Sequence, residues 1–148
     1  MSRESSDPTD VRSIAVSVED LVSALETNRT SSKEAVLRVT PPFSGRMRAR
    51  LHIDVGVPYE QQPRPLHVEP QLLVDETLPP YPRPADTADE LRSDPSVTYT
   101  VERHHTRHRE AVQQWREQVP GTIRDRITVE TPAGPHEVSV TVLGSSVG

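Results

Sequence analysis

The stretch that decides the fold is RMRARLHIDV, residues 46–55, in which polar and apolar side chains alternate without a break. A β-strand points successive side chains to opposite faces, so this period of two predicts a strand with one buried face. A shorter apolar run, residues 35–40, precedes it across the turn-forming sequence PPFSG. The two runs and their short connection predict a β-hairpin.

Three segments have the pattern of helices. Ser17 is a favourable N-cap, Asp20 follows three positions later as in a capping box, and apolar residues recur on one face from Val18 to Leu25. A longer helix is predicted over residues 102–118, ending before Pro120 and Gly121. A short helix is predicted over residues 87–92.

The other apolar segments predict strands. These are residues 66–68, 72–74 and 96–101, and a C-terminal hairpin whose arms, around residues 127–129 and 138–142, are joined by TPAGP. The order of elements predicts an α+β domain with a small, mostly antiparallel sheet and one face covered by two helices. We expect residues 1–12 to form a disordered tail and residues 13–148 a single domain.

The composition excludes several classes of protein. With no cysteine, the chain has no disulfides, no thiolate nucleophile and no cysteine-ligated metal. No apolar run approaches the roughly 18 residues that span a bilayer, and the N-terminus is polar, so we expect a cytoplasmic protein without a membrane partner. Arginine supplies every cation except Lys33, and the net charge is −5, a combination typical of haloarchaeal proteins.

Residues 102–110, ERHHTRHRE, raise the question of a metal site. His104 and His108 are spaced so that two imidazoles on one helix face could bind one ion, with a third ligand from His52, His67, His136 or a carboxylate. No glutamate lies between them as the metalloprotease pattern requires. The same positions continue an apolar stripe toward Trp115, and we interpret the histidines as the margin of a buried helix face. No cofactor is expected.

Arginines suggest a second kind of site. Arg46, Arg48 and Arg50 fall on one face of the predicted strand, and Arg103 and Arg107 lie on the long helix. Guanidinium groups bind phosphates in pairs of hydrogen bonds, so these residues predict a nucleic-acid surface. The acidic net charge and the 3% of aromatic residues argue against it. The alternative is that the strand arginines pair with acidic residues on neighbouring strands.

The sequence favours a non-enzymatic protein-interaction module. It contains no G-x-S-x-G elbow, phosphate loop or dinucleotide fingerprint. An exposed strand face or a proline-rich loop would bind the partner, an unidentified protein. Residues 56–65 and 79–84 are typical of such loops, and Tyr59 and Tyr81 are their candidate contacts. Nucleic-acid association through the arginines and a metal-dependent hydrolase using His104 and His108 are the alternatives.

Two resemblances accompany this interpretation. The stretch AVLRVTPPFSGRMRARLH, residues 35–52, resembles the core of an uncharacterised haloarchaeal protein family, which implies no activity. An N-terminal helix, a hairpin ending in PYE at residues 58–60 and the later LPPYPRP resemble the ubiquitin-conjugating and RWD-type layout. The chain departs from that layout in having no cysteine, a longer spacing between the two turns and a C-terminal hairpin. This second resemblance implies a non-catalytic relative that binds proteins.

Overall fold

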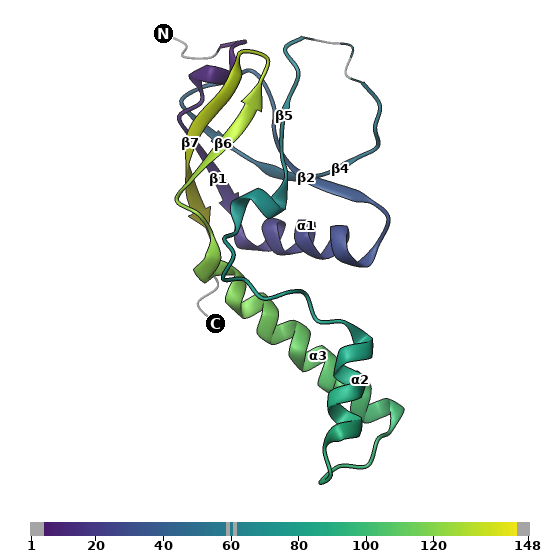
Figure 1. Cartoon of the computed structure of the whole chain (residues 1–148). Helices are drawn as coiled ribbons and strands as arrows, with labels where there is room; N and C mark the ends of the chain where they lie inside the picture. The colour runs from purple at the N-terminus through teal and green to yellow at the C-terminus, as the bar shows by residue number, and fades with distance from the viewer. Residues whose placement is uncertain (1–4, 59, 61, 145–148) are drawn as a thin grey trace. The chain divides into compact units, whose positions relative to one another are not determined.

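The computed structural model describes residues 5–58, 60 and 62–144 and consists of two compact units. The first unit comprises Met1–Asp75 and Ile123–Gly148, and the second comprises Glu76–Thr122 (Figure 1). The α+β class predicted from the sequence is confirmed, with the strands arranged in two sheets. The single domain expected over residues 13–148 stays a prediction, since compactness does not show whether either unit folds alone.

The larger sheet has four strands in the order β3-β1-β7-β6. β1 (Ser13–Ser17) lies in its interior and runs parallel to both β3 (Arg46–Arg48) and β7 (Gly134–Leu143). β6 (Arg126–Thr131) forms an antiparallel hairpin with β7, as predicted for the C-terminal segment. This sheet is therefore mixed rather than mostly antiparallel.

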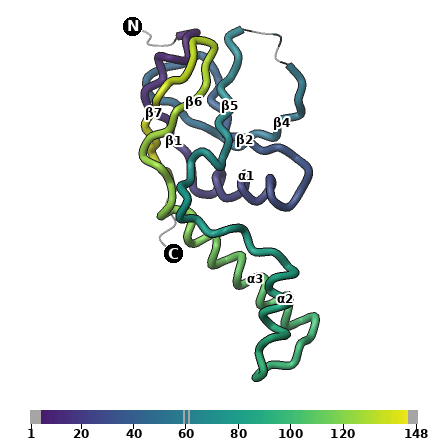
Figure 2. The backbone as a smooth tube through the Cα atoms, in the orientation of Figure 1, coloured from purple at the N-terminus to yellow at the C-terminus, as the bar shows by residue number. Residues whose placement is uncertain are grey.

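The smaller sheet is fully antiparallel. β2 (Glu34–Val39) lies between β4 (Arg50–Asp54) and β5 (Leu66–Val68), as Figure 2 shows. The hairpin predicted before residue 55 is thus present as the β2–β4 pair.

The stretch of residues 46–55 serves both sheets, which corrects the prediction of one continuous strand. Its first part is β3, which pairs with β1, and its second part is β4, which pairs with β2. The change of partner falls at Ala49, which is fully buried and whose amide donates to the Ala15 carbonyl over 2.9 Å. Side-chain alternation continues through this junction, so the sequence pattern gives no sign of it.

Helix α1 (Val18–Thr30) begins where predicted, at the N-cap Ser17. The Ser17 hydroxyl accepts a hydrogen bond from the Asp20 amide over 3.1 Å, which satisfies one free donor of the first turn. Its buried face packs against β2 and β4. The core of the first unit is aliphatic apart from Phe43, and its fully buried larger side chains include Ile14, Val16, Leu21, Leu37, Val39 and Leu73.

The segment before β1 differs from the disordered tail expected over residues 1–12. Residues 1–4 lie outside the described residues. From Ser5 onward the chain is held in place: Ser5 and Phe43 exchange two backbone hydrogen bonds of 2.6 Å, a 3-10 turn (η1, Pro8–Asp10) follows, and Val11 is fully buried. One buried valine in a polar stretch gives no periodic signal, which explains the difference.

The second unit is built from α2 (Pro84–Ser93) and α3 (Val101–Gln118), which pack against each other, with the 3-10 turn η3 (Val119–Thr122) after α3. Two predicted strands are wrong. Residues 96–101 lead into α3, whose N-cap Thr100 accepts a hydrogen bond from the Arg103 amide over 3.1 Å. Residues 72–74 overlap a 3-10 turn in the first unit (η2, Pro70–Leu73), because Pro70 fixes a backbone angle suited to a helical start.

Two further predictions concern helices. Of the two helices expected to cover one sheet face, α1 contacts strands in the first unit and α3 belongs to the second unit. Across the described ranges, no helix combines the length and the apolar character needed to cross a membrane.

Candidate functional site

Tyr59 and Tyr81 are the two tyrosines predicted to contact a protein partner. Tyr59 lies outside the described residues. Tyr81 is half-buried and meets the ring of Trp115 edge-on, with centroids 4.8 Å apart and an interplanar angle of 83°. The indole nitrogen of Trp115 donates to the Pro79 carbonyl over 2.9 Å. These contacts fix the proline-rich segment to α3 within the second unit, so Tyr81 has a packing role there.

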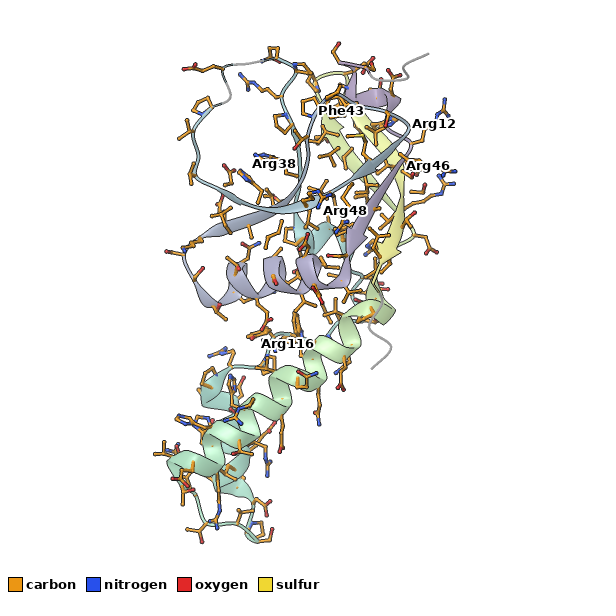
Figure 3. The ribbon with its side chains drawn as sticks, turned by 180° about the vertical axis from the view of Figure 1, so that it is seen from behind. Arg12, Arg38, Phe43, Arg46, Arg48 and Arg116 are labelled. Atoms are coloured by element: carbon orange, nitrogen blue, oxygen red, sulfur yellow. The ribbon has the colours of Figure 1, made fainter. Side chains whose placement is uncertain are left out.

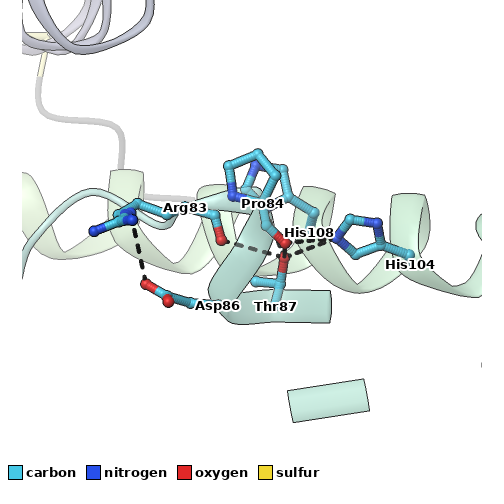
Figure 4. A network of polar contacts seen from close by, with 6 residues as sticks. All are labelled: Arg83, Pro84, Asp86, Thr87, His104 and His108. Atoms are coloured by element: carbon cyan, nitrogen blue, oxygen red, sulfur yellow. Dashed lines mark hydrogen bonds and ion pairs between the residues drawn. The ribbon is translucent and has the colours of Figure 1, made fainter. Parts of the chain in front are cut away.

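His104 and His108 converge on the hydroxyl of Thr87 in α2 (Figure 4). The Thr87 oxygen lies 3.1 Å from His104 Nε2 and 3.0 Å from His108 Nδ1. His104 Nε2 also lies 2.9 Å from the Pro84 carbonyl, and because a carbonyl can only accept, this nitrogen carries the hydrogen. The helical histidine pair therefore joins α3 to α2 by hydrogen bonds.

This arrangement bears on the predicted metal pair. His104 Nε2 and His108 Nδ1 are both within hydrogen-bond distance of the Thr87 hydroxyl. In residues 5–58, 60 and 62–144, no group of three or more His, Cys, Asp or Glu side chains could hold a metal ion. Both histidines are half-buried, as expected for residues at the margin of a buried helix face, and Trp115 of the same helix is buried.

The helical arginines line a shallow depression between α2 and α3. Its walls include Leu91, Val97, Arg103 and Arg107, with Glu102 and Glu110 among them. Arg103 Nη1 donates to the Thr98 carbonyl over 2.6 Å. Because two carboxylates share this surface with the two arginines, it is not a uniformly basic patch.

The strand arginines are divided between the two sheets of the first unit. Arg46 and Arg48 lie on one face of β3, opposite Ser13 and Ala15 of β1, whereas Arg50 begins β4. All three are exposed, and none forms an ion pair with a described residue. Pairing with acidic neighbours, the alternative considered for these side chains, is therefore not found in the described structure.

Arg12 joins Arg46 at the same side of the first unit, which the sequence did not indicate. Figure 3 shows the two side chains projecting beside each other, and the Arg12 amide donates to the Gly45 carbonyl over 2.8 Å. Arg12 is exposed and, within the described residues, forms no ion pair. Sequence reasoning missed it because it fell in the segment expected to be disordered. We call Arg12, Arg46 and Arg48 the arginine cluster.

The smaller sheet has one polar face with charge separated along the strands. At one end Arg50 and His67 flank Arg38 as its direct cross-strand neighbours, and at the other end Glu34 lies directly opposite Asp54. Like charges directly opposite each other are unfavourable in an antiparallel pair. The face is thus positive at one end and negative at the other.

Two histidines lie on this polar face. The rings of His52 and His67 are 5.6 Å apart, and His67 Nδ1 is 3.8 Å from Asp54 Oδ2. Burial lowers the pKa of His67 below its usual value, His52 and Arg38 lower it further, and the Asp54 carboxylate partly opposes them. His67 therefore resists protonation although it faces a carboxylate.

The outer edge of β4 exposes apolar side chains. Leu51 is 37% exposed, and Val55, which directly follows the strand, is 75% exposed. The extended course ends at Gly56, whose φ of +76° turns the chain, and Val57 beyond it is 68% exposed. The period of two correctly placed Leu51 and Val55 on the apolar face, but it could not show that this part of the face lies at a sheet edge.

Backbone groups on this edge face outward. The Leu51 amide donates to the Asp20 carboxylate of α1 over 3.2 Å, so it points away from β2. In a strand, residues two apart present their amide and carbonyl to the same side, so those of Ile53 also point outward. No other described backbone group bonds to Ile53 or to the Val55 amide on that side. We call residues 51–55 the open edge.

The other sheet edges lack this combination. β6 alternates buried Ile127 and Val129 with exposed polar residues, including Arg126, which pairs with Glu137 over 3.1 Å. β3 is three residues long and carries two arginines, and β5 is three residues long. Charges and short lengths are the usual protection of sheet edges, so the open edge is the least protected one described.

The chain belongs to the family defined by a domain of unknown function (DUF8009), whose model matches residues 1–144. This confirms an uncharacterised family, as the resemblance of residues 35–52 implied, and the haloarchaeal origin stays a prediction. Comparison with curated proteins found no match, and neither did comparison with solved structures. The resemblance to ubiquitin-conjugating and RWD-type domains is not supported by either comparison.

Proposed function

We propose that the protein is a non-enzymatic interaction module that binds an extended protein segment at the open edge. The supporting observation is the combination, at residues 51–55, of exposed apolar side chains with outward backbone groups. An added strand satisfies those backbone groups and covers Leu51 and Val55 at the same time. The proposed role, a protein-interaction module, is the one predicted from the sequence, but the proposed contact surface is β4 instead of the loop that contains Tyr81.

Affinity capture with matched variants tests the proposal. Tagged protein carrying Val55→Asp should recover much less partner from lysate of the source organism than the unchanged protein. Val57→Asp is the control, because Val57 is similarly exposed, at 68% against 75%, but lies beyond the turn at Gly56. Equal recovery with all three proteins would contradict a role for the open edge.

A second function, association with nucleic acid, is supported by a separate observation: the arginine cluster is exposed and forms no ion pair with described residues. Arginines without carboxylate partners can bind phosphates without first breaking an ion pair. This function would use one side of the first unit, and it separates Arg50 from the set originally expected to act together.

Salt-dependent binding to duplex and single-stranded DNA and RNA tests this second function. Replacing Arg46 and Arg48 with alanine should weaken binding and reduce the slope of log affinity against log salt by about one per lost phosphate contact. Arg50→Ala is the matched control, an exposed arginine of the neighbouring sheet, and should leave the slope unchanged. Nucleic-acid binding that is unaffected by the double substitution would show that the arginine cluster is not the binding surface.

A further inference from the structure

We infer that the occupant of the open edge is a second copy of the same chain, paired through β4 in antiparallel fashion about a two-fold axis at Ile53. This inference rests on the proposed function, because it names the partner of the same edge. It joins the smaller sheets of two copies into one continuous sheet with the order β5-β2-β4-β4-β2-β5.

The backbone groups select this register. With the axis at Ile53, the amide and carbonyl of Ile53 pair with those of Ile53 in the second copy, and the Val55 amide donates to the Leu51 carbonyl of the second copy. In the same pair the Leu51 amide faces the Val55 carbonyl of the second copy, so the Asp20 carboxylate, which accepts from this amide over 3.2 Å in the single chain, gives way to that carbonyl. An axis at His52 uses the Leu51 amide as well, but it places Val55 opposite the fully buried Ala49 of the second copy instead of opposite Leu51.

The apolar side chains are self-complementary in the same register. Leu51 of each copy lies opposite Val55 of the other, and the two Ile53 side chains lie opposite each other, so the pairing covers the most exposed apolar residue of the edge, Val55 at 75%. Apolar cross-strand pairs of this kind stabilise an antiparallel pair. An edge that satisfies its own backbone and apolar groups needs no other protein.

The proposed register also brings charged side chains of the two polar faces close to each other. Within one chain Arg38 lies opposite Arg50, and Glu34 lies opposite Asp54. The two-fold axis reverses the strand direction, so His52 of one copy lies directly opposite Asp54 of the other, with Arg50 diagonal to the same carboxylate. Each Asp54 carboxylate thereby has the Arg50 guanidinium of the other copy as one diagonal neighbour and the other Asp54 carboxylate as the second.

Sedimentation and light scattering of the purified full chain test the inference. The unchanged protein should show a concentration-dependent molar mass that rises toward twice 16.5 kDa. Val55→Asp should keep the mass at 16.5 kDa, because it places a carboxylate opposite Leu51, whereas Val57→Asp should dimerise as the unchanged protein does. A monomer over the whole concentration range, or equal loss in both variants, would overturn the inference.

Cysteine cross-linking tests the register, since the natural chain contains no cysteine. His52→Cys and Asp54→Cys proteins, mixed and oxidised, should form a covalent dimer, because these residues are directly opposite in a non-hydrogen-bonded pair with Cβ atoms about 4.5–5.5 Å apart. Either protein alone should form little. Strong cross-linking of His52→Cys alone would place the axis at His52 and overturn the register.

Capture and self-association distinguish the two proposals. If the purified protein is monomeric while Val55→Asp still abolishes recovery of a different protein from lysate, the interaction module stands and self-pairing fails. If the protein is monomeric and Val55→Asp changes nothing in capture, both fail. A tagged chain that recovers its untagged copy only when Val55 is intact supports both.

Discussion

The first unit buries Ile14, Leu37 and Phe43 almost completely, whereas the second unit buries the hydroxyl of Thr87 against two histidines of the facing helix. Aliphatic burial is non-directional and sums over many residues. Hydrogen bonds within a short helical pair depend on a few atoms in fixed positions. Leu91 and Trp115 are buried in the second unit as well, so the difference is that its helix pair adds the hydrogen bonds of the Thr87 hydroxyl to a few buried apolar side chains.

The largest effect should come from Phe43→Ala in the first unit. The ring is fully buried, and its loss should destabilise the unit by about 3–5 kcal/mol through lost transfer energy and the cavity left behind. Circular dichroism during urea unfolding measures the whole chain, while fluorescence reports on the second unit alone, because Trp115 is the single tryptophan. If both signals shift together, the two units unfold as one, and their stabilities cannot be compared separately.

A smaller effect should follow Thr87→Val in the second unit. Valine keeps the volume and removes the hydroxyl shared by His104 and His108, so we expect a loss of about 1–3 kcal/mol in the unfolding followed by Trp115 fluorescence. Thr106→Val on α3 is the control, because Thr106 is exposed. Equal changes in the two variants would show that the hydroxyl contacts do not stabilise the helix pair.

The smallest effect should be the pH dependence contributed by His67. Its pKa in the folded protein lies below that in the unfolded chain, so the unfolded chain binds the proton more strongly. The free energy of unfolding is therefore not reduced by His67 above the ordinary histidine pKa of 6.5. It falls as the pH drops from 6.5 toward the pKa of His67 in the folded protein. His67→Gln should flatten this fall in the first unit. A fall of the same steepness in the variant would assign it to other groups.

Local sequence pattern identified α1, α3 and the two hairpins, but it did not identify which strands pair across the sheets. Ser17 fixed the start of α1 through a side-chain cap, and the C-terminal hairpin followed from alternation around TPAGP, because both signals reside in neighbouring residues. The transfer at Ala49 between two sheets and the parallel pairing of β1 with β7 depend on residues far apart in the chain. Period and propensity carry no information about such pairings.

The site shows the same division. The positions of His104 and His108 on one helix face could be read from their spacing, but Thr87 lies in another helix, and nothing near it in the sequence marks it as their partner. Arg46 and Arg48 were correctly placed on one strand face, whereas the separation of Arg50 required the sheet order. The open edge was read as a buried strand face, because alternation identifies faces and not edges.

The parallel pairing of β1 with β7 has a consequence for the order of folding during synthesis. β2, β4 and β5 all lie between Glu34 and Val68, so the smaller sheet can form as soon as that segment leaves the ribosome. β1, by contrast, must wait for β7 at Gly134–Leu143, and until then its Ile14 and Val16 lack one side of their sheet. Between the synthesis of β1 and that of β7 the nascent chain therefore has an unfinished larger sheet, and this interval is when it most needs protection from aggregation.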